Sequence, residues 1–228
     1  MISLSLISNA INAGVNFIIF LKLFSIYRKH RGDRIGETFW DFGMLYLMLA
    51  LFFLSIVIPQ AIFTDLLQVA QVSSLNHLFL ALSVAYFLMM TARLYRRRDL
   101  RAPILIALWS FGLFIVILNL IFLKPNIIEV YQGFKFQKGD FPLFVRALDG
   151  LVTLGGGIAS SLLFLLQGRR TSNLIVRKRS FFIGSGLLLL AVSGVIAFFV
   201  AMASRSTFII FLGSFSAIPA TLLILFGM

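Results

Sequence analysis

The 228-residue sequence contains no cysteine, and only 12% of its residues are charged. The lack of cysteine excludes disulfides, thiol catalysis and thiolate metal sites. The only two histidines in the sequence, His30 and His77, are too few for a histidine-rich metal centre. We therefore predict no metal and no other cofactor. A soluble domain of this length would carry about twice this share of charged residues, so we expect lipid to surround most of the chain.

Apolar residues are what the sequence has in excess. Hydrophobic residues make up 60% of the chain, 26 of them phenylalanine, and the mean hydropathy is +1.02. Seven runs reach the roughly 20 residues that a membrane-spanning helix needs, and none alternates as barrel strands do. We predict an all-α integral membrane protein, a single seven-helix transmembrane domain over residues 1–228, whose first segment is a helix and not a cleaved signal peptide. The expected helices are 3–27, 36–62, 68–93, 103–124, 142–167, 180–203 and 206–227.

The basic residues predict the orientation of these helices. Fourteen of the 20 lysines and arginines lie in the links after the first, third and fifth helices, whereas the alternate links carry few. This is the positive-inside pattern, so we predict an outer amino terminus, a cytoplasmic carboxyl terminus and a plasma or bacterial inner membrane. The net charge of +12 then reports topology and contact with the lipid bilayer, and we expect no nucleic acid partner.

The stretch TARLYRRRDLRAP, residues 91–103, gathers five arginines within nine residues. We interpret it as a cytoplasmic anchor between the third and fourth helices. The alternative is a docking surface for anionic lipid or for a cytoplasmic signalling protein. The residues predicted to form this surface, in two links, are Arg96, Arg97, Arg98, Arg177, Lys178 and Arg179.

Polar residues inside the predicted helices are the candidate site residues, because they are costly in hydrocarbon and usually face the bundle interior. They concentrate in the predicted outer half. In one interpretation they join helices through hydrogen bonds, and Arg146 and Asp149 form an ion pair. In the other they bind a small polar ligand under the outer loop 125–141. The interpretations of this loop are a short hairpin, an interfacial lid and a plain connector. The candidate ligand-binding residues are Asn12, Asn16, Asn76, Arg146 and Asp149.

Two further features concern helix packing. Glu37 and Asp41 lie on one face of the second predicted helix, and we expect them to pair with the arginines of residues 28–34 or with the amides at the start of the helix. A coupling role between helix ends is the alternative. The small residues Gly157 and Ser161, spaced by four, predict close contact between late helices.

No known catalytic motif is visible. The HExxH pattern is absent, and the last predicted helix lacks the lysine that a microbial rhodopsin needs. In gross layout the chain is similar to the seven-helix sensory modules of some bacterial signalling proteins. We predict a sensor or receptor-like module and favour a role without catalysis. A small-solute or ion transporter, an intramembrane lipid-acting enzyme, a structural membrane subunit and a homo-oligomer stay open.

Overall fold

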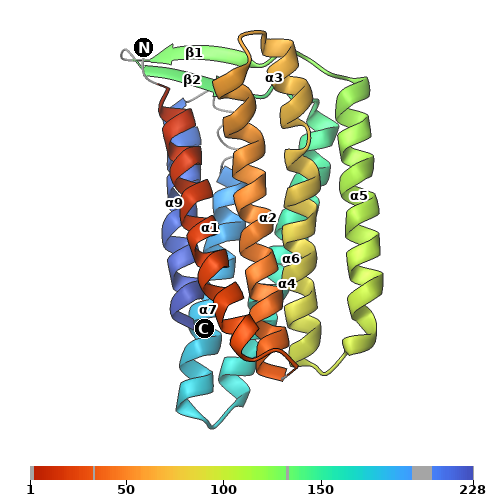
Figure 1. Ribbon diagram of the computed structural model, residues 1–228, viewed down its shortest axis with the longest axis vertical. Coiled ribbons are helices and arrows are strands. Elements are labelled where there is room, and N and C mark those ends of the chain that lie inside the picture. Colours follow the sequence, from red (N-terminus) through yellow and green to blue (C-terminus); the bar gives the residue numbers. More distant parts are fainter. Residues whose placement is uncertain (1–2, 33, 132–133, 197–206, 228) are drawn as a thin grey trace. The chain divides into compact units, whose positions relative to one another are not determined.

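The computed structural model describes residues 3–32, 34–131, 134–196 and 207–227, and these are nearly all helical (Figure 1). The chain divides into two compact units, Met1–Asp149 and Gly150–Met228. We call them unit 1 and unit 2 and describe each by itself.

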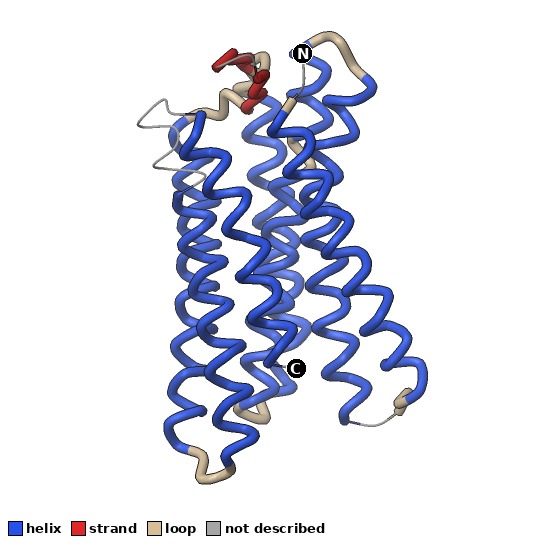
Figure 2. Tube along the Cα trace, turned by 90° about the vertical axis from the view of Figure 1, so that its left-hand side faces the viewer, coloured by secondary structure: helices blue, strands red, loops and turns tan. Residues whose placement is uncertain are grey.

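Unit 1 is built from long helices that pack in chain order: α1 against α2, α2 against α4, and α4 against α5. In both ribbon and tube views these helices run side by side (Figures 1 and 2). The core lies along α2, where Leu45, Tyr46 and Ala50 are completely buried. The elements of unit 1 are α1 (Leu4–Lys29), α2 (Arg34–Ile62), α3 (Leu66–Ser73), α4 (Asn76–Leu94), the 3₁₀ turn η1 (Arg98–Leu100), α5 (Arg101–Ile121) and the first turns of α6 (Leu143–Arg170).

The predicted helix 68–93 is two helices, α3 and α4. The carboxylate Oδ1 of Asp65 accepts a hydrogen bond from the Leu67 amide at 2.9 Å and so caps the start of α3. Ser74 lies at the break, and its hydroxyl donates to the carbonyl of Ala70 at 2.9 Å. Such a bond from serine to its own helix competes with the backbone ladder and bends helices. The prediction was therefore right about an apolar helical segment and wrong about its continuity.

The loop predicted at 125–141 contains two antiparallel strands, β1 (Ile127–Tyr131) and β2 (Phe134–Lys138), with Ile127 opposite Lys138. The expected hairpin strands are thus confirmed. Strand β2 lies against the start of α1, where the Gln137 amide donates to the Ser5 hydroxyl at 3.2 Å. We call this end of unit 1 the sheet end. The opposite end, which bears Arg93 to Arg101, is the arginine end (Figure 1).

Unit 2 contains the rest of α6, α7 (Leu174–Val195) and α9 (Thr207–Gly227). The helices of unit 2 approach one another closely at glycine positions. A Cβ on Gly157 would lie 2.8 Å from that of Ala191, and the hydroxyl of Ser161 donates to the Gly184 carbonyl at 2.8 Å. The predicted close contact through Gly157 and Ser161 is confirmed.

The start of α7 differs from the prediction. We expected this helix over 180–203, but it begins at Leu174 because the Asn173 side chain accepts hydrogen bonds from the amides of Ile175 and Val176. The cap brings the basic residues 177–179 into the helix. The described helix ends at Val195, and residues 197–203 lie outside the described residues.

Among the described residues, five helical segments are long and apolar enough to cross a membrane. The chain is therefore a multi-pass helical membrane protein. The count of seven spans and their orientation stay predictions, because the first two turns of α7 carry three basic residues and the side chains of residues 207–215 in α9 lie outside the described part of the chain. The five segments are Leu4–Lys29, Gly36–Ile62, Leu66–Arg93, Arg98–Ile121 and Leu143–Arg170.

Candidate functional site

The most unusual feature of the sheet end is a buried pair of ionisable groups. His77, in the first turn of α4, and Asp149, on α6, have side chains that are 1% and 3% exposed. Nδ1 of His77 lies 2.5 Å from Oδ2 of Asp149. The ring of Phe141 meets the His77 ring edge-on, with 4.8 Å between centroids. An ionised Asp149 requires a hydrogen on Nδ1, which leaves Nε2 as an acceptor in neutral imidazole or a donor in imidazolium.

The predicted ion pair between Arg146 and Asp149 is wrong. Nη2 of Arg146 contacts Oδ1 of Asp140 at 3.3 Å, and Asp140 also lies 3.8 Å from Nζ of Lys124. The spacing of three does place Arg146 and Asp149 on neighbouring positions of α6. Helical side chains, however, lean toward the amino terminus of their helix, so the long guanidinium reaches back to the loop.

A second polar contact joins α5 to the junction of α3 and α4. Nδ2 of Asn119 donates to Oγ of Ser74 at 2.7 Å, and both residues are 1% exposed. From the polar residues inside the apolar segments we had predicted hydrogen bonds of this kind between helices. The predicted site residue Asn76 lies two positions beyond Ser74 and is 4% exposed.

Several buried polar atoms close to this junction have no hydrogen-bond partner within the described part of the chain. Native proteins pair nearly all such atoms, and an unpaired one costs about 1–3 kcal/mol. Four of them belong to residues that neighbour His77 in sequence or Asp149 on α6. They are Ser73 Oγ, Asn76 Oδ1, His77 Nε2 and Arg146 Nε. We call Ser73, Asn76, His77, Arg146 and Asp149 the His77 cluster; it combines acceptors, a hydroxyl and a guanidinium donor, as a site for a small polar molecule does.

The predicted site residues Asn12 and Asn16 lie on α1, and each is 1% exposed. They share one face, as their spacing indicated. Nδ2 of Asn12 donates to the Ser8 carbonyl at 3.0 Å, and Nδ2 of Asn16 donates to the Asn12 carbonyl at 2.7 Å. These bonds run within α1, and a contact of either residue with a ligand stays a prediction.

The arginine end holds a second charged group. Oδ2 and Oδ1 of Asp41 lie 2.6 Å from Arg93 and 3.0 Å from Arg101, and Glu37 contacts Arg93 at 3.0 Å. Arg98 reaches Glu37 at 3.4 Å. Among the described side chains, the two carboxylates pair with arginines at the end of α4 and the start of α5 and not with the expected residues 28–31. The side chain of Arg34 lies outside the described residues. A cavity of about 80 Å³ lies among these residues.

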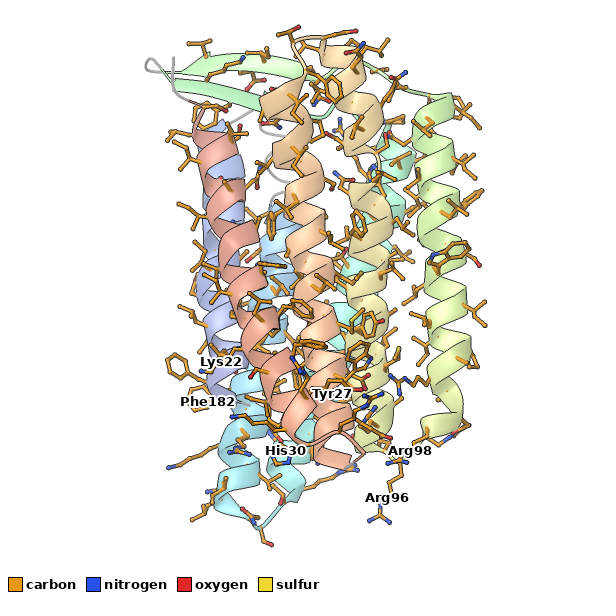
Figure 3. The ribbon with its side chains drawn as sticks, in the orientation of Figure 1. Lys22, Tyr27, His30, Arg96, Arg98 and Phe182 are labelled. Atoms are coloured by element: carbon orange, nitrogen blue, oxygen red, sulfur yellow. The ribbon has the colours of Figure 1, made fainter. Side chains whose placement is uncertain are left out.

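The predicted docking arginines of the link differ in their surroundings. Arg97 forms a two-point contact with Asp99, at 3.0 and 2.9 Å, and this hydrogen bond raises the pKa of the Arg97 guanidinium. Arg96 has a left-handed backbone (φ 58°), as the residue after a helix often does. Arg96 points away from the helices (Figure 3), whereas Arg98 contacts Glu37 of α2. In unit 2, the side chains of residues 177–179 are exposed in the first two turns of α7.

Sequence reasoning identified Arg146, Asp149 and Asn76 but left His77 out of the site. A signal was present: His77 and Asp149 are each an ionisable residue in a largely apolar segment, at similar predicted depth. Each such group is costly to bury alone, and pairing offsets part of that cost. A comparison of the chain with models of known protein families found no match, and a comparison with curated proteins found none either. The function is therefore inferred from the residues themselves.

Proposed function

We propose that this multi-pass membrane protein is a sensor or receptor-like module. A small polar ligand binds at the His77 cluster, and a cytoplasmic partner reads the resulting change at the arginine end. The observation that carries the proposal is the group of buried, unpaired polar atoms around an ionisable pair. A ligand that supplies their missing hydrogen bonds gains several contacts at once, and the contact with the Arg146 guanidinium is charge-assisted.

Helix α4 supports a connection between the two ends of unit 1. It begins beside His77 and ends beside Arg93, which contacts both Glu37 and Asp41. A ligand shifts such a helix only if it binds two arrangements with different affinity. A donor on the ligand that takes over the Asp149 carboxylate would release His77 and so favour a second position of α4.

A small-solute transporter is the second candidate, favoured by ionisable groups at both ends of unit 1. The middle of α4 argues against it. The hydroxyls of Ser83 and Thr91 donate to carbonyls of their own helix, at 2.7 and 2.9 Å. They therefore offer a passing solute little polar contact between His77 and Arg93.

The experiment is a thermal-shift screen of the purified protein in lipid nanodiscs against millimolar amines, carboxylates, sugars and amino acids. A ligand of the cluster should raise the unfolding temperature of the natural protein. Asp149→Asn and Asn76→Ala should abolish the shift, whereas Asp99→Asn, which removes an exposed carboxylate at the other end, should keep it. Circular dichroism checks that each variant is folded.

Two results would count against the proposal. One is a set of hits whose shift is equal in Asp149→Asn and in the natural protein, because the ligand would then bind elsewhere. The other is accumulation of a labelled hit inside vesicles that contain the protein, which would favour the transporter.

A further inference from the structure

The acidic residues of this chain are confined to unit 1. All eight lie between Asp33 and Asp149, whereas residues 150–228 carry six lysines and arginines and no aspartate or glutamate. Within the described part of the chain, no ion pair involves Arg169 and Arg170 at the end of α6 or the three basic residues of α7. The positive charge of unit 2 is therefore not balanced by carboxylate side chains of its own.

Two of these basic residues, Arg177 and Lys178, lie at one end of a groove between α7 and α9. The groove has a volume of about 340 Å³. Positions 178, 181, 182 and 185 follow the three-and-four spacing of a single helix face, and α9 contributes the other wall. The lining residues are Arg177, Lys178, Phe181, Phe182, Ser185 and Leu223.

The groove changes character along its length. It begins at the two cations and continues for about 10 Å along α7, at 1.5 Å per residue, over mainly apolar side chains. Phe181 and Phe182 are 39% and 43% exposed, and Phe182 is labelled in Figure 3. Beneath the groove the helices touch, since a Cβ on Gly186 would lie 2.8 Å from the Ala220 carbonyl oxygen. The floor is thus fixed by backbone contact.

We propose that this groove binds an anionic phospholipid. The phosphate diester accepts charge-assisted hydrogen bonds from Arg177 and Lys178, and an acyl chain lies along Phe181, Phe182 and Leu223, where it covers exposed apolar surface. Basic pockets between membrane helices recognise lipid headgroups in this way. A free phosphate would use only the first contact. A zwitterionic lipid carries the same phosphate diester, but its own headgroup cation offsets that charge, so it binds the two basic residues more weakly. The proposal does not depend on the His77 cluster or its ligand.

The test measures lipid binding to the full chain. The protein is purified in detergent, titrated with dioleoylphosphatidylglycerol or dioleoylphosphatidylcholine, and analysed by native mass spectrometry. The natural protein should prefer the anionic lipid by about tenfold to thirtyfold, as expected for two cations beside a headgroup with a net negative charge. Arg177→Gln combined with Lys178→Gln should bring the two lipids to nearly equal affinity.

The matched control is Arg169→Gln combined with Arg170→Gln. It removes the same charge from exposed positions at the end of α6 and should keep the preference. Equal loss in both double variants would overturn the proposal, because diffuse charge would then explain the binding. So would a natural protein that shows no preference, or displacement of the lipid by 10 mM inorganic phosphate, which would indicate a plain anion site.

A second variant tests the apolar half without touching the cations. Phe182→Ser, at a partly exposed position, should leave the fold intact and weaken both lipids several-fold while the preference for the anionic lipid persists. An unchanged affinity for both lipids in Phe182→Ser would show that no acyl chain lies in the groove and would overturn the proposal.

Discussion

Replacing Asp41 by asparagine should destabilise the protein far more than replacing Glu37 by glutamine. Both carboxylates contact the same arginine, Arg93, at 2.6 and 3.0 Å, and both changes remove one negative charge. The two differ in burial: the side chain of Asp41 is 1% exposed and that of Glu37 is 42% exposed. Asp41 also contacts Arg101 at 3.0 Å.

The expected magnitudes follow from this difference. Removing one partner of a buried ion pair leaves an uncompensated charge and costs about 3–5 kcal/mol. Asparagine can accept from one guanidinium but turns an amide donor toward the other, so Asp41→Asn should lie in that range. An exposed pair is worth at most about 1 kcal/mol, which is the limit for Glu37→Gln.

The assay is reversible unfolding in mixed micelles by titration with sodium dodecyl sulfate, followed by the loss of helical circular dichroism. Adding Arg101→Gln to Asp41→Asn should restore part of the lost stability, because it removes the surplus positive charge; a double-mutant cycle isolates this coupling. Equal small losses for Asp41→Asn and Glu37→Gln would refute the reasoning and show that water solvates Asp41.

Three further predictions concern packing, backbone and topology. Gly186→Ala should cost about 1–3 kcal/mol of stability, since the added Cβ would meet the backbone of α9. Gly155→Ala, with no described atom within 4 Å of the added Cβ, should gain up to about 1 kcal/mol of helix stability. Equal effects of the two substitutions in the same titration would contradict the close contact between Gly186 and α9. Arg96→Gly should stabilise by about 0.5–1 kcal/mol, because glycine adopts a φ of 58° without strain, and a loss of stability would show that the Arg96 side chain does more than occupy the turn. The natural chain has no cysteine, so an impermeant maleimide should label Thr64→Cys on intact cells but Ser172→Cys only after permeabilisation; the reverse pattern would overturn the predicted orientation.

The long apolar segments could be predicted because they depend on local sequence. Runs of apolar residues define α1, α2, α5 and α6 to within a few residues, and the aromatic arms on either side of Gly133 indicated the two strands. The break between α3 and α4 was missed, since it rests on a serine that bonds to its own helix at Ser74. The start of α7 was missed because the cap residue, Asn173, stands before a basic run that looked like a link.

Partners distant in sequence could not be predicted from spacing. Asp149 was assigned to Arg146, three positions away, yet it contacts His77, 72 positions away. The carboxylate of Asp41 was likewise assigned to a neighbouring link but meets Arg93 and Arg101. In each case the positions of charged residues on a helix were read correctly. The missing information was which helices pack together, and only the tertiary structure supplies it.

The two units balance their positive charge in different ways, because only unit 1 contains acidic residues. In unit 1 the buried arginine contacts of Asp41 and the His77 contact of Asp149 are made within the chain, so they need no particular lipid. In unit 2 the cations of α7 have no acidic residue in their own unit to pair with. Anionic headgroups are the counter-charge that a membrane offers at this position. Exchanging anionic for neutral lipid should therefore change the stability of unit 2 more than that of unit 1, and hydrogen exchange resolved along the chain can distinguish the two.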